Sequence, residues 1–258
     1  LYHFFHRGTP FYSEKGKIKR DYADDVRLKK MLMYTMDFIL PTIGYHMNDR
    51  EIFHLTKADF IKEIERSFSD SILPFQITEI PVFPEYESET ESLADLKKQL
   101  CQISANQYLD IIVNILGVMN RNGMSGYSFV HHHIRDYFAS YYIIQRMREA
   151  LAVYNHGKNT HAQHYILSDS DDVAAIIRHC LEPVFYEIPD ETIKSFLGEI
   201  LGEHRNTPIL DAENCWHIPN ATVPEQKMLC QLLDIYRYSS IDPQYLISNI
   251  VEIIKKVR

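Results

Sequence analysis

Apolar side chains recur at steps of three and four residues over long stretches of this chain, and this spacing limits what it can fold into. The clearest series comprises Ile134, Tyr137, Phe138, Tyr141, Ile144, Met147 and Leu151. Such steps place side chains on one face of an α-helix, because a helical turn takes about 3.6 residues. Similar series begin near Asp21 and at Ser104. Only 9 of the 258 residues are glycine. We therefore predict a mainly α-helical fold.

Proline and short apolar runs interrupt these helices. Pro41 lacks an amide proton, so it should bend or end the helix that starts near Asp21. Residues 51–55 and 127–131 are predicted to be short strands, the second after a turn between Gly123 and Gly126. Thr56 followed by Asp59 has the spacing of a capping box and predicts a helix start. The helix from Ser104 is expected to have an apolar side that reaches Met119.

This order of elements is compatible with a winged-helix unit, and it suggests three domains. Residues 1–47 are expected to end a helical domain, and residues 48–154 to form a winged-helix domain that contains an acidic loop at 77–95. Residues 155–258 are expected to form a helical repeat-like domain of stacked short helices. Helix starts are predicted at Ser168, Asp190, Thr222 and Asp242, with a long loop at 203–221.

Charge and composition argue against several partners. The formal net charge is -8, and no segment gathers a basic stripe, so nucleic acid is not an expected partner. No apolar run reaches the ~20 residues that span a bilayer. The cysteines, at 101, 180, 215 and 230, form no CxxC pair, which favours a reduced, cytoplasmic location. The first residue is Leu1, so we expect a fragment of a longer chain.

One dense motif is the segment FVHHHIRDYFASYY at 129–142. It resembles the winged-helix segment of NACHT-domain NTPases of the STAND class. Upstream, LPTIGYHM at 40–47, followed by Leu55-Thr56 and Phe60-Ile61, is similar to the stretch that precedes that segment in bacterial members. Together the two resemblances cover about 110 residues in the family's order.

The resemblance implies a regulatory and switch region that holds the ADP-bound resting state and links an ATPase core to a sensor. In the family, a histidine of the winged helix lies near the β-phosphate of ADP, and the matching residue is His131. The implied cofactors are ADP or ATP with Mg²⁺, bound by an ATPase module outside this chain, and none by this chain alone. Implied partners are that upstream module, a protein or other ligand at the helical region, and further copies on activation.

No catalytic motif occurs in the chain itself. It contains no GxxxxGK[ST] loop and no GxSxG elbow, so the parent protein would be an ATPase whose P-loop lies elsewhere. The consecutive histidines 131–133 suggest a metal, but ligands on one helix face need steps of three or four. Adjacent histidines should point apart, so we predict no metal site.

Two alternative functions stay open. One is a helical scaffold that binds a protein partner. The other is a DNA-binding winged helix, which needs a basic recognition helix. In the helix after Thr56, Lys57, Lys62 and Arg66 are offset by Asp59, Glu63 and Glu65, so this alternative is the weaker one.

Overall fold

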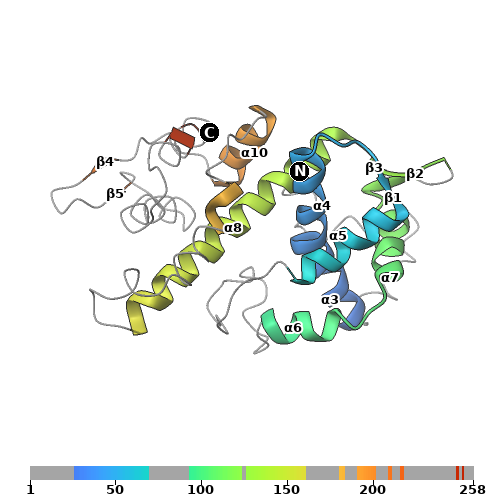
Figure 1. Ribbon diagram of the computed structural model, residues 1–258, viewed down its shortest axis with the longest axis horizontal. Helices are drawn as coiled ribbons and strands as arrows, with labels where there is room; N and C mark the ends of the chain where they lie inside the picture. The colour runs from blue at the N-terminus through green and yellow to red at the C-terminus, as the bar shows by residue number, and fades with distance from the viewer. Residues whose placement is uncertain are drawn as a thin grey trace. The chain divides into compact units, whose positions relative to one another are not determined.

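The structure is a computed structural model, and it is mainly helical with a small antiparallel sheet (Figure 1). It describes residues 26–69, 93–123, 126–160, 180–183, 191–201, 209–210, 216–217, 248–249 and 252. The chain divides into two compact units. The first comprises 1–71 and 91–142, and the second comprises 72–90 and 143–258.

The first unit is built around a buried helix of three consecutive pieces: α3 (Val26–Tyr34), the π-helical turn η1 (Thr35–Ile39) and α4 (Leu40–Asp49). Pro41 was expected to bend or end this helix, and it does not end it, because the helix continues to Asp49. Pro41 lies in the first turn of α4, where the missing N–H is tolerated. The interruption lies just before it, where the Leu40 N–H donates to the Thr35 carbonyl over the wider π-helical step.

Helix α5 (Lys57–Ser69) begins where the capping box predicts. The Asp59 N–H donates to Thr56 Oγ1 over 3.1 Å, and the Thr56 hydroxyl donates to Asp59 Oδ2 over 2.7 Å. This hydrogen bond from Thr56 is the main reason that the pKa of Asp59 is lowered. Phe60 and Ile64 point into the core, as the apolar spacing predicts.

Three helical pieces follow: α6 (Leu93–Leu100), α7 (Ala105–Asp110) and the π-helical η3 (Ile111–Ile115). Tyr108 is fully buried, and its hydroxyl donates to the Leu100 carbonyl over 2.8 Å. The predicted extension of this helix to Met119 is wrong. Gly117 adopts a φ of 61°, which favours glycine and turns the chain out of the helix. Of the expected acidic loop, 93–95 belong to α6 and 77–92 lie outside the described residues.

The sheet has strand order β1-β3-β2. Its strands are β1 (Leu55–Thr56), β2 (Met119–Asn122) and β3 (Gly126–Phe129). Only Leu55 of the strand expected at 51–55 is in a strand, and the strand expected at 127–131 runs from Gly126 to Phe129. In the hairpin, Met119 pairs with Phe129, and across the other edge of β3 Leu55 pairs with Tyr127. Tyr127 and Phe129 alternate with Ser128 and are buried against the helices.

Helix α8 (His132–Thr160) follows directly and takes part in both units. The predicted inner face is confirmed for Tyr137, Phe138, Tyr141, Ile144 and Met147, which are all buried. Ile134 is partly exposed, and the side chain of Leu151 lies outside the described residues. No helix in the described part of the chain is apolar enough over a sufficient length to cross a bilayer.

In the second unit, α10 (Glu191–Leu201) starts next to the predicted Asp190 and buries Ile193 and Leu197. The loop expected at 203–221 is wrong in part, because β4 (Ile209–Leu210) and β5 (Trp216–His217) pair antiparallel within it. Aromatic and branched side chains favour such pairing. The helix starts predicted at Ser168, Thr222 and Asp242 lie outside the described residues.

Candidate functional site

The two sequence segments that carry the family resemblance are in direct contact in the fold. Segment 40–47 lies in α4, and segment 129–142 ends β3 and begins α8. The rings of Tyr45 and Tyr142 stack with centroids 4.4 Å apart. Gly44 lies against the backbone of the first turns of α8, where an added β-carbon would meet the Arg135 carbonyl oxygen at 2.8 Å. Helix α4 therefore supports the start of α8.

A buried ion pair between Arg135 and Asp136 also stabilises the first turns of α8. The Arg135 guanidinium donates to Asp136 Oδ1 from Nε over 3.0 Å and from Nη2 over 2.8 Å. The Asn48 amide of α4 donates to the same oxygen over 3.2 Å. Asp136 is only 1% exposed, and a buried carboxylate with several donors keeps its partners in place. Arg135 also lies over the ring of Phe53, 5.3 Å from its centroid.

His131 lies between β3 and α8 and is the N-cap residue of α8. Its backbone carbonyl accepts from the Ile134 N–H over 3.1 Å, and its ring atom Nδ1 accepts from the His133 N–H over 3.2 Å. The preceding residue, Val130, extends the sheet edge by donating to the Val118 carbonyl over 3.0 Å. The imidazole itself is exposed. His131, the site residue predicted from the sequence, is thus fixed through its backbone and its Nδ1 atom, and the rest of its imidazole is exposed.

This cap determines which ring nitrogen can act as a donor. Nδ1 must keep its lone pair to accept the His133 N–H, so in the neutral ring the proton is on Nε2. The Nε2–H group can donate to a ligand. The amides of the first helical turn and the macrodipole of this 29-residue helix also favour an anion at this end.

The three imidazoles of His131, His132 and His133, here called the histidine triplet, lie together at the surface. Their ring centroids are 4.0 to 4.9 Å apart, and one ring nitrogen from each lies within 4.8 Å of the others. The expectation that adjacent histidines point apart is wrong. The closest pair, His132 and His133, lies within the first turn of α8 with ring centroids 4.0 Å apart, and His131, which precedes the helix, stacks on His132 at 4.3 Å.

A second charged cluster, which the sequence did not reveal as a cluster, joins α4 to α5. Glu63 accepts from His46 Nδ1 over 2.7 Å and from Arg50 Nη1 over 3.1 Å, and Arg66 Nη1 lies 3.5 Å away. Burial of Glu63 disfavours its charge, but the hydrogen bond from His46 and the charges of His46, Arg66 and Arg50 outweigh it. The pKa of the Glu63 carboxyl is therefore lowered. The sequence signal that could have indicated this cluster was the position of Glu63 between Phe60 and Ile64 on the apolar face of the helix.

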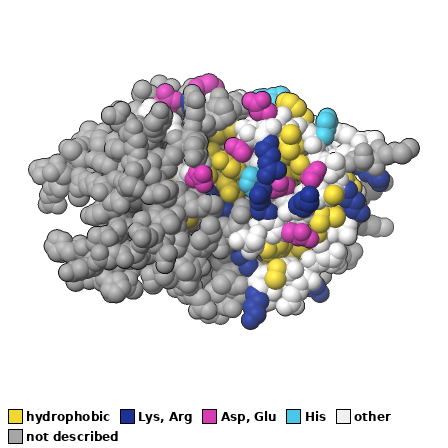
Figure 2. All heavy atoms as spheres, in the orientation of Figure 1, with side chains coloured by type: hydrophobic (Ala, Val, Ile, Leu, Met, Phe, Trp, Pro, Cys, Tyr) yellow, Lys and Arg dark blue, Asp and Glu magenta, His cyan; other side chains and the backbone are white. Residues whose placement is uncertain are grey.

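Ion pairs also involve the cations of α5, the helix that would contact DNA if the chain were a DNA-binding winged helix. Lys62 Nζ lies 3.6 Å from Asp59 Oδ1, and Arg66 is paired with Glu63. Figure 2 shows described lysine and arginine side chains interspersed with acidic and apolar ones on one face of the molecule. Lys62 and Arg66 thus each have an acidic neighbour on the same helix.

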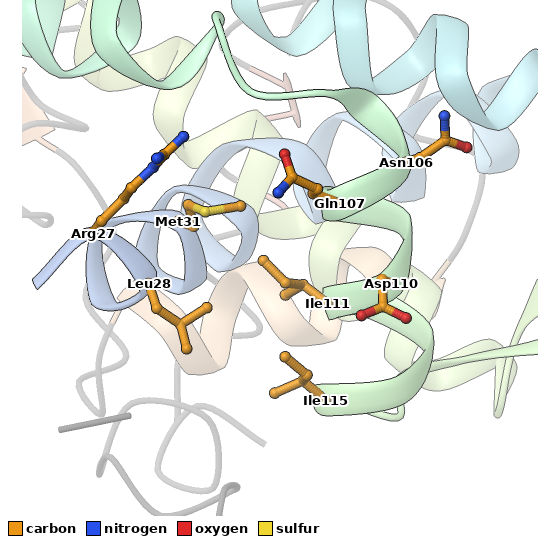
Figure 3. A pocket seen from close by; sticks show the side chains of 8 residues that line it. All are labelled: Arg27, Leu28, Met31, Asn106, Gln107, Asp110, Ile111 and Ile115. Carbon is orange, nitrogen blue, oxygen red and sulfur yellow. The ribbon is translucent and has the colours of Figure 1, made fainter. Parts of the chain in front are cut away.

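A pocket of about 510 Å³ lies between α3 and the α7–η3 segment (Figure 3). Its lining residues are Arg27, Leu28, Met31, Asn106, Gln107, Asp110, Ile111 and Ile115. The apolar side chains come from both walls, and Arg27 and Asp110 add opposite charges. None of the predicted site residues lines this pocket, so it is separate from His131.

We found no match to this chain among protein families, curated proteins or solved structures.

Proposed function

We propose that this chain is the regulatory and switch region of a nucleotide-dependent signalling NTPase of the STAND class, with a winged-helix unit at 48–154 and a stacked helical region at 155–258. Its ATPase module would bind ADP or ATP with Mg²⁺ and would lie outside this chain. In the resting state, His131 donates a hydrogen bond to the β-phosphate of ADP. The observation that carries this proposal is the N-cap role of His131, which leaves Nε2–H as the donor at the end of a long helix.

The energetics suit a contact that biases a switch. A hydrogen bond to a charged group contributes about 1.5–3 kcal/mol, and the helix end adds about 0.3–1 kcal/mol. Since 1.4 kcal/mol corresponds to tenfold in an equilibrium, losing the contact changes ADP retention by roughly ten- to several-hundredfold. Exchange of ADP for ATP would remove this contact, release the regulatory region and permit oligomerisation. The nucleotide biases the equilibrium only through such differential contacts.

The surroundings of His131 support a protein partner on the same surface. Val130, its neighbour in the chain, is 42% exposed, and Phe53, which contacts Arg135 of α8, is 62% exposed. Large apolar side chains at an exposed site are typical of an interface. The ATPase module of the same protein would cover them in the ADP-bound state.

The order of elements supports the winged-helix part. A short strand, a helix, further helices and a two-stranded hairpin follow one another, and the first strand joins the hairpin in one sheet of order β1-β3-β2. His131 lies two residues after the end of the last of these strands. In this proposal the hairpin is the wing, and the protein acts in the cytoplasm.

The first test is the gene. A P-loop and an acidic Walker B strand encoded upstream of residue 1 are required, and a complete gene without them overturns the proposal. The second test measures release of a fluorescent ADP analogue from the full-length protein. His131→Ser keeps an N-cap oxygen and removes the imidazole, so we expect normal thermal stability and ADP release faster by about tenfold or more.

Controls separate the phosphate contact from the helix cap. His131→Ala removes both, so it should release ADP as fast as His131→Ser and also melt at a lower temperature. His54→Gln alters another exposed histidine and should leave ADP release unchanged. Unchanged ADP release and unchanged basal signalling in His131→Ser would rule out the phosphate contact.

A helical scaffold is the second candidate, and the exposure of Phe53 and Val130 favours it equally. The two functions differ in their dependence on nucleotide. A scaffold would bind its partner with the same affinity when ADP and ATP are exchanged, and Phe53→Ser would weaken that binding under both conditions. In the switch proposal, Phe53→Ser should raise basal signalling without an added partner.

A further inference from the structure

We propose that the histidine triplet binds one divalent transition-metal ion such as Zn²⁺ or Cu²⁺. The ion would be coordinated by a ring nitrogen of each of His131, His132 and His133. The sequence spacing predicts no metal here, and the inference comes from the convergence of the side chains in the fold. It goes beyond the proposed switch function and does not depend on it, because all ligands belong to this chain.

The ring nitrogens are close enough for one ion after small rotations. Zinc binds imidazole nitrogen at about 2.0–2.1 Å, so two nitrogens on a tetrahedral ion lie about 3.4 Å apart. In the triplet, one nitrogen from each ring lies within 4.8 Å of the others. All three side chains are exposed, so their rings can turn to close the difference. Imidazole is a ligand that zinc and copper favour.

One of the three ligands, His133, has a buried carboxylate behind it. His133 Nδ1 lies 4.0 Å from Asp136 Oδ2, and a carboxylate next to the non-coordinating nitrogen is the usual outer partner of a metal-bound histidine. Asp136 is itself held by Arg135 and Asn48. The second ring, His132, is placed by the first turn of α8. Three protein ligands leave a fourth position for water, as in open zinc sites.

Two effects limit the affinity. Coordination through His131 Nε2 requires the ring proton to leave that atom, and a shift to Nδ1 would remove the acceptor of the His133 N–H. Loss of an N-cap of this kind corresponds to about fivefold, and the positive end of the helix dipole opposes a cation by about two- to fivefold. We therefore expect a dissociation constant of about micromolar order, weaker than a closed structural zinc site.

The test is a calorimetric titration of the 258-residue chain, freed of metal by a chelator, with ZnCl₂ and separately with CuCl₂. We expect one site that is lost in the variant carrying His131→Asn, His132→Gln and His133→Gln together. Asparagine at 131 preserves a cap oxygen, so the helix start is kept, which the melting temperature checks. Each single substitution should weaken binding by about tenfold or more. His54→Gln is the matched control and should change nothing.

A second comparison asks whether the fold builds the site. A synthetic peptide of residues 126–138 has the same three histidines and also Arg135 and Asp136, but it lacks Asn48 and the fold that buries the Asp136 carboxylate. We expect it to bind Zn²⁺ at least about tenfold more weakly than the chain. The proposal is overturned if the triple variant keeps the site with unchanged affinity, if His54→Gln lowers affinity as much as the triplet variants, or if the peptide binds as tightly as the chain.

Discussion

A β-carbon placed on Gly44 would lie 2.8 Å from the carbonyl oxygen of Arg135, 3.0 Å from Phe138 Cβ and 3.1 Å from the Ala139 amide nitrogen. Helices α4 and α8 therefore meet backbone to backbone at this point. The first of these distances is shorter than protein β-carbons tolerate, and the neighbouring atoms are largely backbone, which cannot rotate away. The position of His131 at the start of α8 depends on this contact.

Gly44→Ala should destabilise the protein by about 1–3 kcal/mol, because the added methyl forces the two helices apart. The sign of this stability change is informative, since alanine in a helix interior normally stabilises a protein by about 1 kcal/mol relative to glycine. Chemical denaturation of the two proteins measures the difference. A variant that is as stable as the wild type would contradict the close approach of α4 and α8.

Thr56→Ala should lower the unfolding free energy by about 1 kcal/mol through loss of the N-cap of α5, whereas Thr56→Ser should restore most of it. The hydrogen bond from Thr56 is the main cause of the lowered pKa of Asp59. NMR titration of the Asp59 carboxyl should therefore show its pKa rising towards the ordinary value in Thr56→Ala. An unchanged Asp59 titration would show that the hydroxyl does not hold the carboxylate.

Glu63→Gln should destabilise the protein at neutral pH by about 1–3 kcal/mol, because His46, Arg50 and Arg66 lose their shared carboxylate. The pKa of Glu63 is lowered in the folded state, so its contribution is fully present above the ordinary value of about 4.3. It is lost as the pH falls through the lowered value.

Urea unfolding at several pH values checks this dependence. The difference between wild type and Glu63→Gln should shrink as the pH falls from about 5 towards the lowered pKa and below it. Glu65→Gln, an exposed position on the same helix, serves as the control and should stay within about 0.5 kcal/mol of the wild type. A pH-independent difference would contradict the ion cluster.

Tyr108→Phe should cost about 1 kcal/mol, since it removes the donor to the Leu100 carbonyl. Burial raises the pKa of Tyr108 well above its ordinary value. The folded state thus prefers the neutral phenol, and the stability that this group contributes is lost as the pH rises above about 10, the ordinary value. In Tyr108→Phe the fall in stability at alkaline pH should be smaller, which guanidinium unfolding between pH 8 and 11 would measure.

The presence of the main helices and the N-cap at Thr56 could be predicted from the sequence, because both depend on the spacing of residues that are near in the chain. The π-helical turns could not. A shift of one residue in hydrogen bonding leaves the apolar spacing almost intact. The turn at Gly117 was also missed, because Met119 in β2 is buried like the helical residues before it and continues their apolar spacing. The convergence of the histidine triplet was missed because residue spacing does not determine side-chain torsions, and these bring even the adjacent helical rings of His132 and His133 to 4.0 Å.

The Glu63 cluster shows a different limit. Its partners His46 and Arg50 come from α4 and from the residue that caps it, and only Arg66 is near in the chain. Charge counting along α5 therefore treated Glu63 as a surface residue that offsets a cation. The position of Glu63 on a buried face could be interpreted only when its contact with His46 of α4 was known.

The pairing of Leu55 with Tyr127 also has a kinetic consequence. The hairpin of β2 and β3 joins neighbouring segments and can close within microseconds, whereas β1 comes from a distant part of the chain and must wait for a large loop to close. We expect a folding intermediate in which the helices and the hairpin are formed and one edge of β3 is still unpaired. Such an edge is a template for intermolecular association, so the refolding yield should fall with rising protein concentration.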